Sequence, residues 1–340
     1  MINSHPTTAT HTDASTSPSP ANARHRVRHA IFPVAGFGAS FLPATKACPK
    51  EMLPIVDRPM IQYAVEEAAA AGITRMIFIT ARGKRAIEDH FDRAYELERE
   101  LVAREDDEAL RELRGTIPAG VSFSYVRQRE TTGLLDALLK ARSLVGDEPF
   151  AVLLPDQLID AEPGALAQLL DVFDEQCVSV VGAERIAPRS ADPACFISAD
   201  LRTSAVRSAR ALVKVPPIGA ASAPVNLSGR FVFTSAIWGA IETATEGSHP
   251  RTLVSAIRAL MERERVFACL IDGRRFDCST KLGFMQAQFA FAQKRAELWS
   301  GLRRSLAEIL DKGPGAREHG PAPALTSTTS TAATRRQHEA

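Results

Sequence analysis

Two segments of the chain carry residue types suited to binding phosphate and a divalent cation. The first, residues 33–54, reads PVAGFGASFLPATKACPKEMLP and contains Gly36, Gly38, Lys46 and Lys50. Glycines let backbone amides approach a phosphate, and lysines add positive charge beside it. The pattern predicts a phosphate-binding loop, and a pair of ordinary turn glycines is the alternative that it leaves open.

The second segment, LLPDQLID at residues 153–160, places Asp156 directly after an apolar run. A carboxylate at a strand end, opposite a basic phosphate loop, suits a Mg²⁺-nucleotide site. A helix cap or plain loop residue is the alternative. The first loop lacks the third glycine of a dinucleotide fingerprint, and the next strand ends in Thr80 instead of an acidic residue, which counts against NAD binding. The chain has no Walker A pattern.

Strands and helices alternate along most of the chain. Apolar runs predict strands at residues 30–34, 75–80, 121–126, 150–154 and 177–181. Helical spacing predicts a helix from an N-cap at Asp57 to Gly72, one or two surface helices within 87–114, and helices at 133–142, 164–173, 252–262 and 281–298. Residues 194–234 favour short antiparallel strands. These patterns predict an α/β fold: a mainly parallel sheet with helices on both faces and antiparallel additions in the second half.

Composition excludes several functional classes. A net charge of +1 gives no field that would attract nucleic acid or a membrane surface, and no run approaches the ~20 apolar residues of a membrane span. The five cysteines are scattered, without a CxxC or Cys/His cluster, so neither a disulfide framework nor a zinc site is indicated. We expect a cytoplasmic protein in a reducing compartment.

Both ends of the chain differ from its middle. Residues 1–27 and 313–340 are rich in Ser, Thr, Pro and Ala, and we expect two disordered tails around one domain at 28–312. The basic run RHRVRH at 24–29 fits a solvated tail, with a targeting or polyanion-binding arm as the alternative. No apolar segment accompanies it, which argues against a secretory signal.

The motifs taken together resemble a known enzyme family. The pattern GxGTRxLPxTKxxPKEMLPxVDxPxIQY is present here as GFGASFLPATKACPKEMLPIVDRPMIQY, and VRQ (126–128), VGDEPFAVLLPD (145–156), GRFVF (229–233) and FDCSTKLGFMQA (276–287) also match. Over about residues 30–295 the chain resembles the UTP–glucose-1-phosphate uridylyltransferases. The resemblance implies a nucleotidyltransferase (Rossmann-like) fold.

The resemblance also implies a reaction and a set of residues. The phosphate of glucose 1-phosphate would attack the α-phosphate of UTP in line and expel pyrophosphate, a step that depends on positioning and charge stabilisation. Asp156 and Asp277 would hold Mg²⁺, and Lys50 would contact phosphate. The uridine pocket would be lined by Ala35, Gly36, Glu51, Gln128 and Gly133. A surface partner of Lys50 is the alternative for Glu51, and Gln128 could offer uracil both a donor and an acceptor.

Several family positions are replaced near the nucleotide. The family's Thr-Arg pair is Ala39–Ser40 here, and a neutral serine cannot replace a cation with five donors. The family's KGLGHA is TGLLDA, so Leu135 stands where a glycine lets the nucleotide come close, and Asp136 adds a negative charge.

The sugar-binding positions are replaced as well. Phe196 adds bulk where the family has glycine, and the family's EKP is Lys214–Val215–Pro216. Lys214 is one residue away from the family's lysine, and adjacent strand residues point to opposite faces, so we expect it to point away from the sugar.

Two functions remain open from the sequence. One is an enzyme that makes UDP-glucose weakly or uses another sugar 1-phosphate. The other is a catalytically impaired paralog that binds nucleotide or regulates an active homologue; the shared fold cannot separate them. The implied partners are UTP, a sugar 1-phosphate and Mg²⁺, with a homodimer or homotetramer as the assembly.

Overall fold

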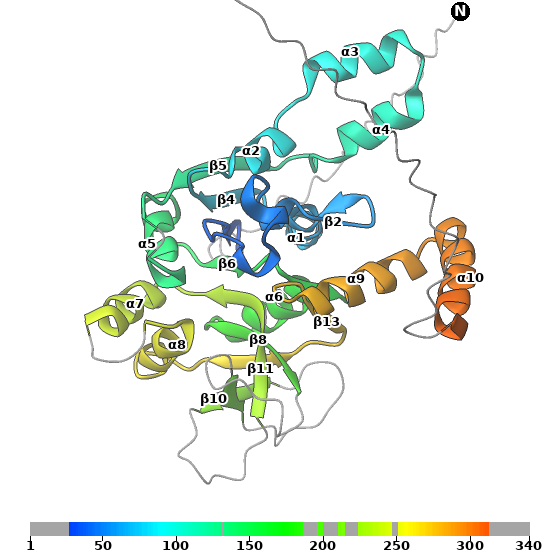
Figure 1. Ribbon diagram of the computed structural model, residues 1–340. Coiled ribbons are helices and arrows are strands. Elements are labelled where there is room, and N and C mark those ends of the chain that lie inside the picture. The colour runs from blue at the N-terminus through cyan, green and yellow to red at the C-terminus, as the bar shows by residue number, and fades with distance from the viewer. Residues whose placement is uncertain are drawn as a thin grey trace, which may run out of the picture. The chain divides into compact units, whose positions relative to one another are not determined.

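A computed structural model describes residues 27–130, 132–185, 196–199, 210–214, 224–246 and 251–312 (Figure 1). The chain divides after Phe291 into two compact units. The second unit contains helix α10 (Ala296–Lys312), and the first contains the sheet and the helices that cover it. Val215, one of the positions predicted to lie near the sugar, is outside the described residues.

The first unit is built on one large sheet of nine strands in the part of the chain that the structure describes. The strands are β1 (His29–Pro33), β4 (Arg75–Thr80), β5 (Ser122–Arg127), β6 (Phe150–Leu153), β8 (Val180–Arg185), β9 (Phe196–Ala199), β10 (Arg210–Lys214), β11 (Pro224–Phe233) and β12 (Phe267–Leu270). Their order is β5-β4-β1-β6-β11-β8-β12-β10-β9.

Most of these strands run in one direction. β5, β4, β1 and β6 pair in parallel, and β8 pairs in parallel with β12. β11 is antiparallel to both β6 and β8, so the two parallel groups point the same way. β9 and β10 add antiparallel pairs at the far edge. The predicted α/β fold, mainly parallel with antiparallel additions in the second half, is confirmed.

Helices cover both faces because successive strand residues point to opposite sides. Ile31 packs in a core with α5 (Leu134–Val145), α7 (Ala236–Glu246) and α8 (Leu253–Met261). Phe32, the next residue, packs in a second core with α1 (Met60–Ala70), α2 (Arg85–Phe91) and α6 (Ala165–Gln176). The other α-helices of the described residues are α3 (Tyr95–Ala103), α4 (Asp107–Gly115) and α9 (Lys281–Gln293), and short 3₁₀ helices lie at Ala39–Phe41, Ala44–Lys46 and Lys50–Met52.

Among the described residues, two small two-stranded sheets lie outside the large one. β2 (Pro54–Ile55) pairs with β3 (Arg58–Pro59), and β7 (Gln157–Asp160) pairs with β13 (Arg274–Asp277), both antiparallel. Buried side chains of both, including Ile55, Leu158 and Phe276, share a third apolar cluster with α9. Both predicted metal carboxylates lie at the β7–β13 sheet, because Asp277 ends β13 and Asp156 directly precedes β7.

Several local predictions are wrong. Asp57 does not cap a helix: it follows Val56 in the turn between β2 and β3, and α1 has Pro59 at its N-cap. Residues 87–114 belong to three helices, and the predicted helix at 281–298 is two helices, α9 and α10. Cys177 does not start β8 but ends α6 in a left-handed conformation, with φ of 52°.

No helix among the described residues combines the length and the apolar character that crossing a bilayer requires.

Candidate active site

A cleft of about 250 Å³ opens where β1, β5 and β6 end, lined by Pro33, Ala35, Gly36, Glu51, Gln128, Gly133, Leu134, Ala137, Leu154, Pro155 and Asp156. Gln128 directly follows β5, and Leu154 directly follows β6. The cleft therefore lies beyond the carboxyl ends of parallel strands, where open α/β sheets bind ligands. Of the predicted site residues it brings together Ala35, Gly36, Glu51, Gln128, Gly133 and Asp156.

The two glycines of the first loop do different things. Gly36 lines the cleft, and a Cβ there would meet nothing within 4 Å. Gly38 has φ of 66°, and its Cβ would lie 3.0 Å from Cβ of Lys50, so a side chain would crowd the loop. The carbonyl of Gly38 also accepts a hydrogen bond from Oγ1 of Thr45 at 2.7 Å. Gly38 thus shapes the loop, whereas Gly36 leaves room for a ligand.

Lys50 and Asp156 form an ion pair at the edge of the cleft. Nζ of Lys50 lies 2.6 Å from Oδ2 of Asp156, with side chains 13% and 24% exposed. The pair joins the first loop to the segment after β6, which are the two segments that the sequence singled out. Lys46, the other lysine of the loop, is exposed and does not line the cleft.

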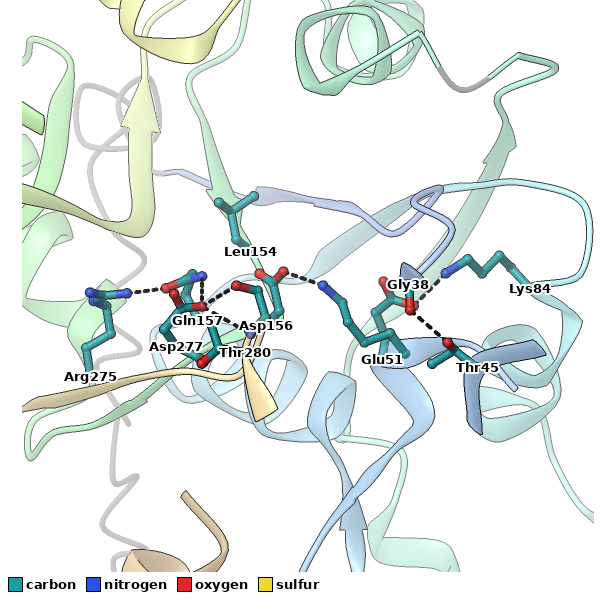
Figure 2. A network of polar contacts seen from close by, with 12 residues as sticks. Gly38, Thr45, Glu51, Lys84, Leu154, Asp156, Gln157, Arg275, Asp277 and Thr280 are labelled. Carbon is teal, nitrogen blue, oxygen red and sulfur yellow. Dashed lines mark hydrogen bonds and ion pairs between the residues drawn. The ribbon is translucent and has the colours of Figure 1, made fainter. Parts of the chain in front are cut away.

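Glu51 pairs with a lysine that the sequence analysis did not identify. Nζ of Lys84 lies 2.7 Å from Oε2 of Glu51, and both side chains are buried, at 7% and 6% exposure (Figure 2). The alternative for Glu51, a surface pair with Lys50, is wrong, because Lys50 pairs with Asp156. One signal could have identified Lys84: it follows the carboxyl end of β4, at the same edge of the sheet as the cleft.

Gln128 is 2% exposed and is held by polar contacts on both its backbone and its side chain. Its backbone N–H donates to the carbonyl of Thr80 at 2.8 Å. Its side-chain Nε2 donates to Oδ2 of Asp136 at 2.8 Å, with longer contacts to Oγ1 of Thr132 at 3.3 Å and the carbonyl of Gly133 at 3.4 Å. The side chain is therefore fixed where it borders the cleft.

Asp156 and Asp277 lie at neighbouring ends of the β7–β13 pair (Figure 2). Asp277 pairs with Gln157, and the N–H of Cys278 donates to the carbonyl of Asp156 at 2.8 Å. Oδ1 of Asp277 accepts from Nε2 of Gln157 at 3.0 Å, and from the N–H and hydroxyl of Ser279 at 3.1 and 2.6 Å.

Electrostatics at these two carboxylates favour negative charge on Asp277. Burial raises the pKa of Asp277, but hydrogen bonds from Ser279 and Gln157 and the charge of Arg275 more than offset it, so the pKa lies below its usual value. Burial, together with the nearby charges of Asp156 and Asp277, raises the pKa of the Cys278 thiol to about 12. Cys278 is therefore a neutral thiol beside the two carboxylates in the metal-free protein.

The two carboxylates fit a magnesium ion by their chemistry. Among the described residues no group of three or more His, Cys, Asp and Glu side chains could hold a metal. Mg²⁺ is usually held by only one or two protein carboxylates, with substrate phosphates and water completing its shell. Two acidic oxygen donors without a sulfur or imidazole partner therefore suit Mg²⁺ better than zinc.

A buried arginine fixes the backbone in front of Asp156. Arg230 is 1% exposed, and its Nε and Nη2 donate to the carboxylate of Glu67 at 2.8–3.1 Å. Its Nη1 donates to the carbonyl of Leu154 at 3.1 Å. Gly229, with φ of 81°, lies so close to Gln157 that a Cβ would be 2.7 Å from that side chain. The GRFVF motif thus supports the strand end that carries Asp156.

The positions that depart from the family differ in where they lie. Ala39 and Ser40 are exposed in a short 3₁₀ helix, Ala39–Phe41, of the first loop. The prediction that Leu135 lies beside the nucleotide is wrong, because this side chain does not line the cleft. It is 2% exposed and packs in the core with α7 and α8. It lies on the first turn of α5, and Leu134 and Ala137 face the cleft in its place.

The sugar-side positions lie on the antiparallel strands. Phe196 begins β9 and Lys214 ends β10, and Lys214 pairs with Ser198. These strands place both positions at the sheet edge beyond β12.

Comparison with known proteins places this chain in a family. Residues 30–277 match the family described as nucleotidyl transferase. The UTP–glucose-1-phosphate uridylyltransferase YngB of Bacillus subtilis is 40% identical over 290 residues, which cover 85% of this chain and 97% of that protein. A second UTP–glucose-1-phosphate uridylyltransferase of Bacillus subtilis is 41% identical over 290 residues, 84% of this chain and 98% of that protein.

A solved structure agrees with these sequence relatives. The UTP-bound UGPase from Acinetobacter baumannii superposes with a TM-score of 0.75 at 32% identity, covering 84% of this chain and 100% of that one. The resemblance predicted from the motifs is confirmed. The chain therefore belongs to the nucleotidyl transferase family and, within it, to the group of the UTP–glucose-1-phosphate uridylyltransferases.

Proposed function

We propose that this protein transfers the uridylyl group of UTP to glucose 1-phosphate, forming UDP-glucose and pyrophosphate. One observation carries the proposal: residues that the resemblance assigns to the uridine pocket line a single cleft together with Asp156. The names of the relatives and the UTP bound in the solved neighbour support the same substrates.

The reaction asks for positioning and charge compensation. A phosphate oxygen of glucose 1-phosphate forms a bond to the α-phosphorus of UTP, and the bond to the β-phosphate oxygen breaks, so pyrophosphate leaves with the electron pair. The attacking oxygen already carries negative charge, so no protein base is needed to remove a proton. The chain's residues have to hold two anionic substrates close together and in line.

Lys50 is the cation that we assign to the phosphates. Its ion pair with Asp156 holds its ammonium group at the cleft edge before substrate arrives. A pre-positioned charge costs no reorganisation when negative charge shifts in the transition state, which makes such groups effective. Gly36 leaves the backbone beside the phosphates open to close approach.

Asp156 and Asp277 are the residues that we assign to Mg²⁺. The bound ion would neutralise charge on the phosphates of UTP. The low pKa of Asp277 keeps that carboxylate ionised at neutral pH, and its hydrogen bonds from Gln157 and Ser279 fix its orientation. A cytosolic location is our proposal from the free thiols of the described cysteines, and a homodimer or homotetramer is our proposal from the family resemblance.

One observation favours the second candidate, a paralog that binds nucleotide without efficient turnover. The first loop is neutral and exposed at Ala39 and Ser40, where the family motif carries an arginine. A missing charge-assisted contact to phosphate typically slows the reaction by roughly two to three decades.

The test measures pyrophosphate release and UTP binding on the same full-length protein with Mg²⁺. If the protein is an active transferase, pyrophosphate release should require glucose 1-phosphate. The rate of that release should fall at least ~100-fold in Asp156→Asn. UTP binding without release supports the impaired paralog. If the protein neither binds UTP nor releases pyrophosphate, both candidate functions are contradicted.

A further inference from the structure

The amide group of Gln128 has a fixed direction. Its Nε2 faces two oxygens that can only accept hydrogen bonds, Oδ2 of Asp136 at 2.8 Å and the carbonyl of Gly133 at 3.4 Å. Turning the amide over would place its carbonyl oxygen against a carboxylate, acceptor against acceptor. Chemistry alone therefore identifies the atom that faces Asp136 as nitrogen.

The contacts of Asp136 favour its ionised form and fix its position. It lies on the first turn of α5, where the helix dipole favours negative charge. Oδ1 of Asp136 lies 3.5 Å from Nζ of Lys140, one turn further along the helix. Burial raises the pKa of Asp136, but hydrogen bonds with Thr132 and Gln128 and the charge of Lys140 outweigh it, and the pKa is lowered overall.

Because Nε2 of Gln128 is engaged, the amide oxygen Oε1 is the atom that can contact a ligand. Gln128 lines the cleft, and with Nε2 engaged its Oε1 is the polar atom that remains for a ligand; no hydrogen bond from another described residue reaches Oε1. The sequence left open that Gln128 offers a base both a donor and an acceptor. The structure leaves it chiefly as an acceptor.

We propose that Asp136 is a specificity-determining positioning residue that locks Gln128 with its carbonyl oxygen toward the cleft, so that the site selects a nucleobase edge that donates an N–H. Uracil fits because its N3–H donates. Cytosine presents a lone pair at N3 and would have to shift its edge until the amino group faced Oε1. The inference rests on the proposed function, in which a uracil nucleotide occupies this cleft.

The structure offers a matched control for the test. Glu130 and Asp136 line the same surface hollow, with Arg127, Arg129, Thr132 and Lys140. Asp136→Asn and Glu130→Gln each remove one negative charge from that hollow, but only Asp136 contacts Gln128. The asparagine can present either its amide or its carbonyl to Gln128, so Asp136→Asn weakens the preference for one direction of the Gln128 amide at nearly constant size.

The experiment measures dissociation constants of Mg²⁺-UTP and Mg²⁺-CTP by calorimetry for the full chain and its variants. We expect the unmodified protein and Glu130→Gln to prefer UTP by at least about tenfold, because a buried acceptor facing an acceptor goes unsatisfied. In Asp136→Asn the ratio of the CTP to the UTP dissociation constant should fall at least about fivefold, chiefly because CTP binds more tightly. Asp136→Ser, which also removes the carboxylate, should lower the ratio too.

The outcomes separate this inference from the proposed function. An unchanged UTP:CTP ratio in either folded Asp136 variant contradicts the lock while leaving uridylyl transfer intact. An equal fall in Glu130→Gln also contradicts it, because net charge and not the contact would then set the ratio. Binding of neither nucleotide by the unmodified protein contradicts the proposed function, and the inference with it.

Discussion

Lys50 and Asp156, 106 positions apart in the chain, meet with Nζ 2.6 Å from Oδ2. The contact couples the basic first loop to the carboxylate after β6. The ammonium group neutralises a carboxylate that we assign to a divalent cation, so the lysine and the metal would compete for the same carboxylate. The pair therefore has two roles with opposite consequences for metal binding and for turnover.

Lys50→Met should separate these two roles. Removing the ammonium group should slow pyrophosphate release by roughly two to three decades, since a charge on the phosphates is lost. The same change should tighten Mn²⁺ or Mg²⁺ binding to the free protein, measured by calorimetry without nucleotide. Lys46→Met is the control, because Lys46 is exposed and outside the cleft. Weaker metal binding in Lys50→Met would contradict the competition.

Lys84→Met should destabilise the fold because it leaves Glu51 buried without its partner. Breaking a buried pair on one side typically costs about 3–5 kcal/mol, whereas removing both charges is far milder. Urea unfolding should therefore show a large loss for Lys84→Met and a partial recovery in Lys84→Met with Glu51→Gln. Arg85→Met, one residue along, affects only an exposed pair with Asp89 and should change little. A double variant no more stable than Lys84→Met would argue against the pairing.

Glu98 should make stability depend on acidity below about pH 4.5. Hydrogen bonds from Arg93 and then Arg114 lower the pKa of Glu98 from 4.5 to about 2. A depressed carboxylate pKa stabilises the fold above the unfolded pKa, and that contribution is lost as pH falls from about 4.5 towards 2. The melting temperature should thus fall less steeply over that range in Glu98→Gln than in the unmodified protein. Parallel curves would rule the contribution out.

Removing both predicted tails should leave the folded body intact. Residues 1–23 and 313–340 have too little apolar side chain to contribute a core. The melting temperature of the shortened chain should stay within about 2 °C of the full chain. A fall of several degrees would mean that one tail stabilises the folded part.

The sequence predicts strands better than it predicts what joins them. β1, β4 and β6 are short apolar runs buried on both faces, so composition alone marks them. The helix before β4 was predicted to start at Asp57 because aspartate is a common N-cap. Asp57 lies instead in the turn between β2 and β3, because Ile55 of β2 packs in a cluster formed by residues distant in the chain.

The site residues also differ in how well the sequence predicts them. Glycines, Lys50 and Asp156 are visible because their types and their places beside strands suggest chemistry. Lys84 was missed because its partner Glu51 is 33 residues away, and only the fold brings the two together. Leu135 was assigned to the nucleotide because of its position in a motif, whereas the helical turn directs it into the core.

Uridylyl transfer moves the α-phosphate of UTP onto the sugar phosphate, so the fate of that phosphate shows whether the protein is a transferase. The full-length protein is incubated with Mg²⁺, glucose 1-phosphate and UTP labelled at the α-phosphate, and the label is followed into UDP-glucose beside pyrophosphate. We predict label in UDP-glucose equal to the pyrophosphate formed, dependent on glucose 1-phosphate and nearly abolished in Asp156→Asn. Bound UTP whose label never enters a nucleotide sugar, at any sugar phosphate concentration, would show that the protein does not transfer the uridylyl group.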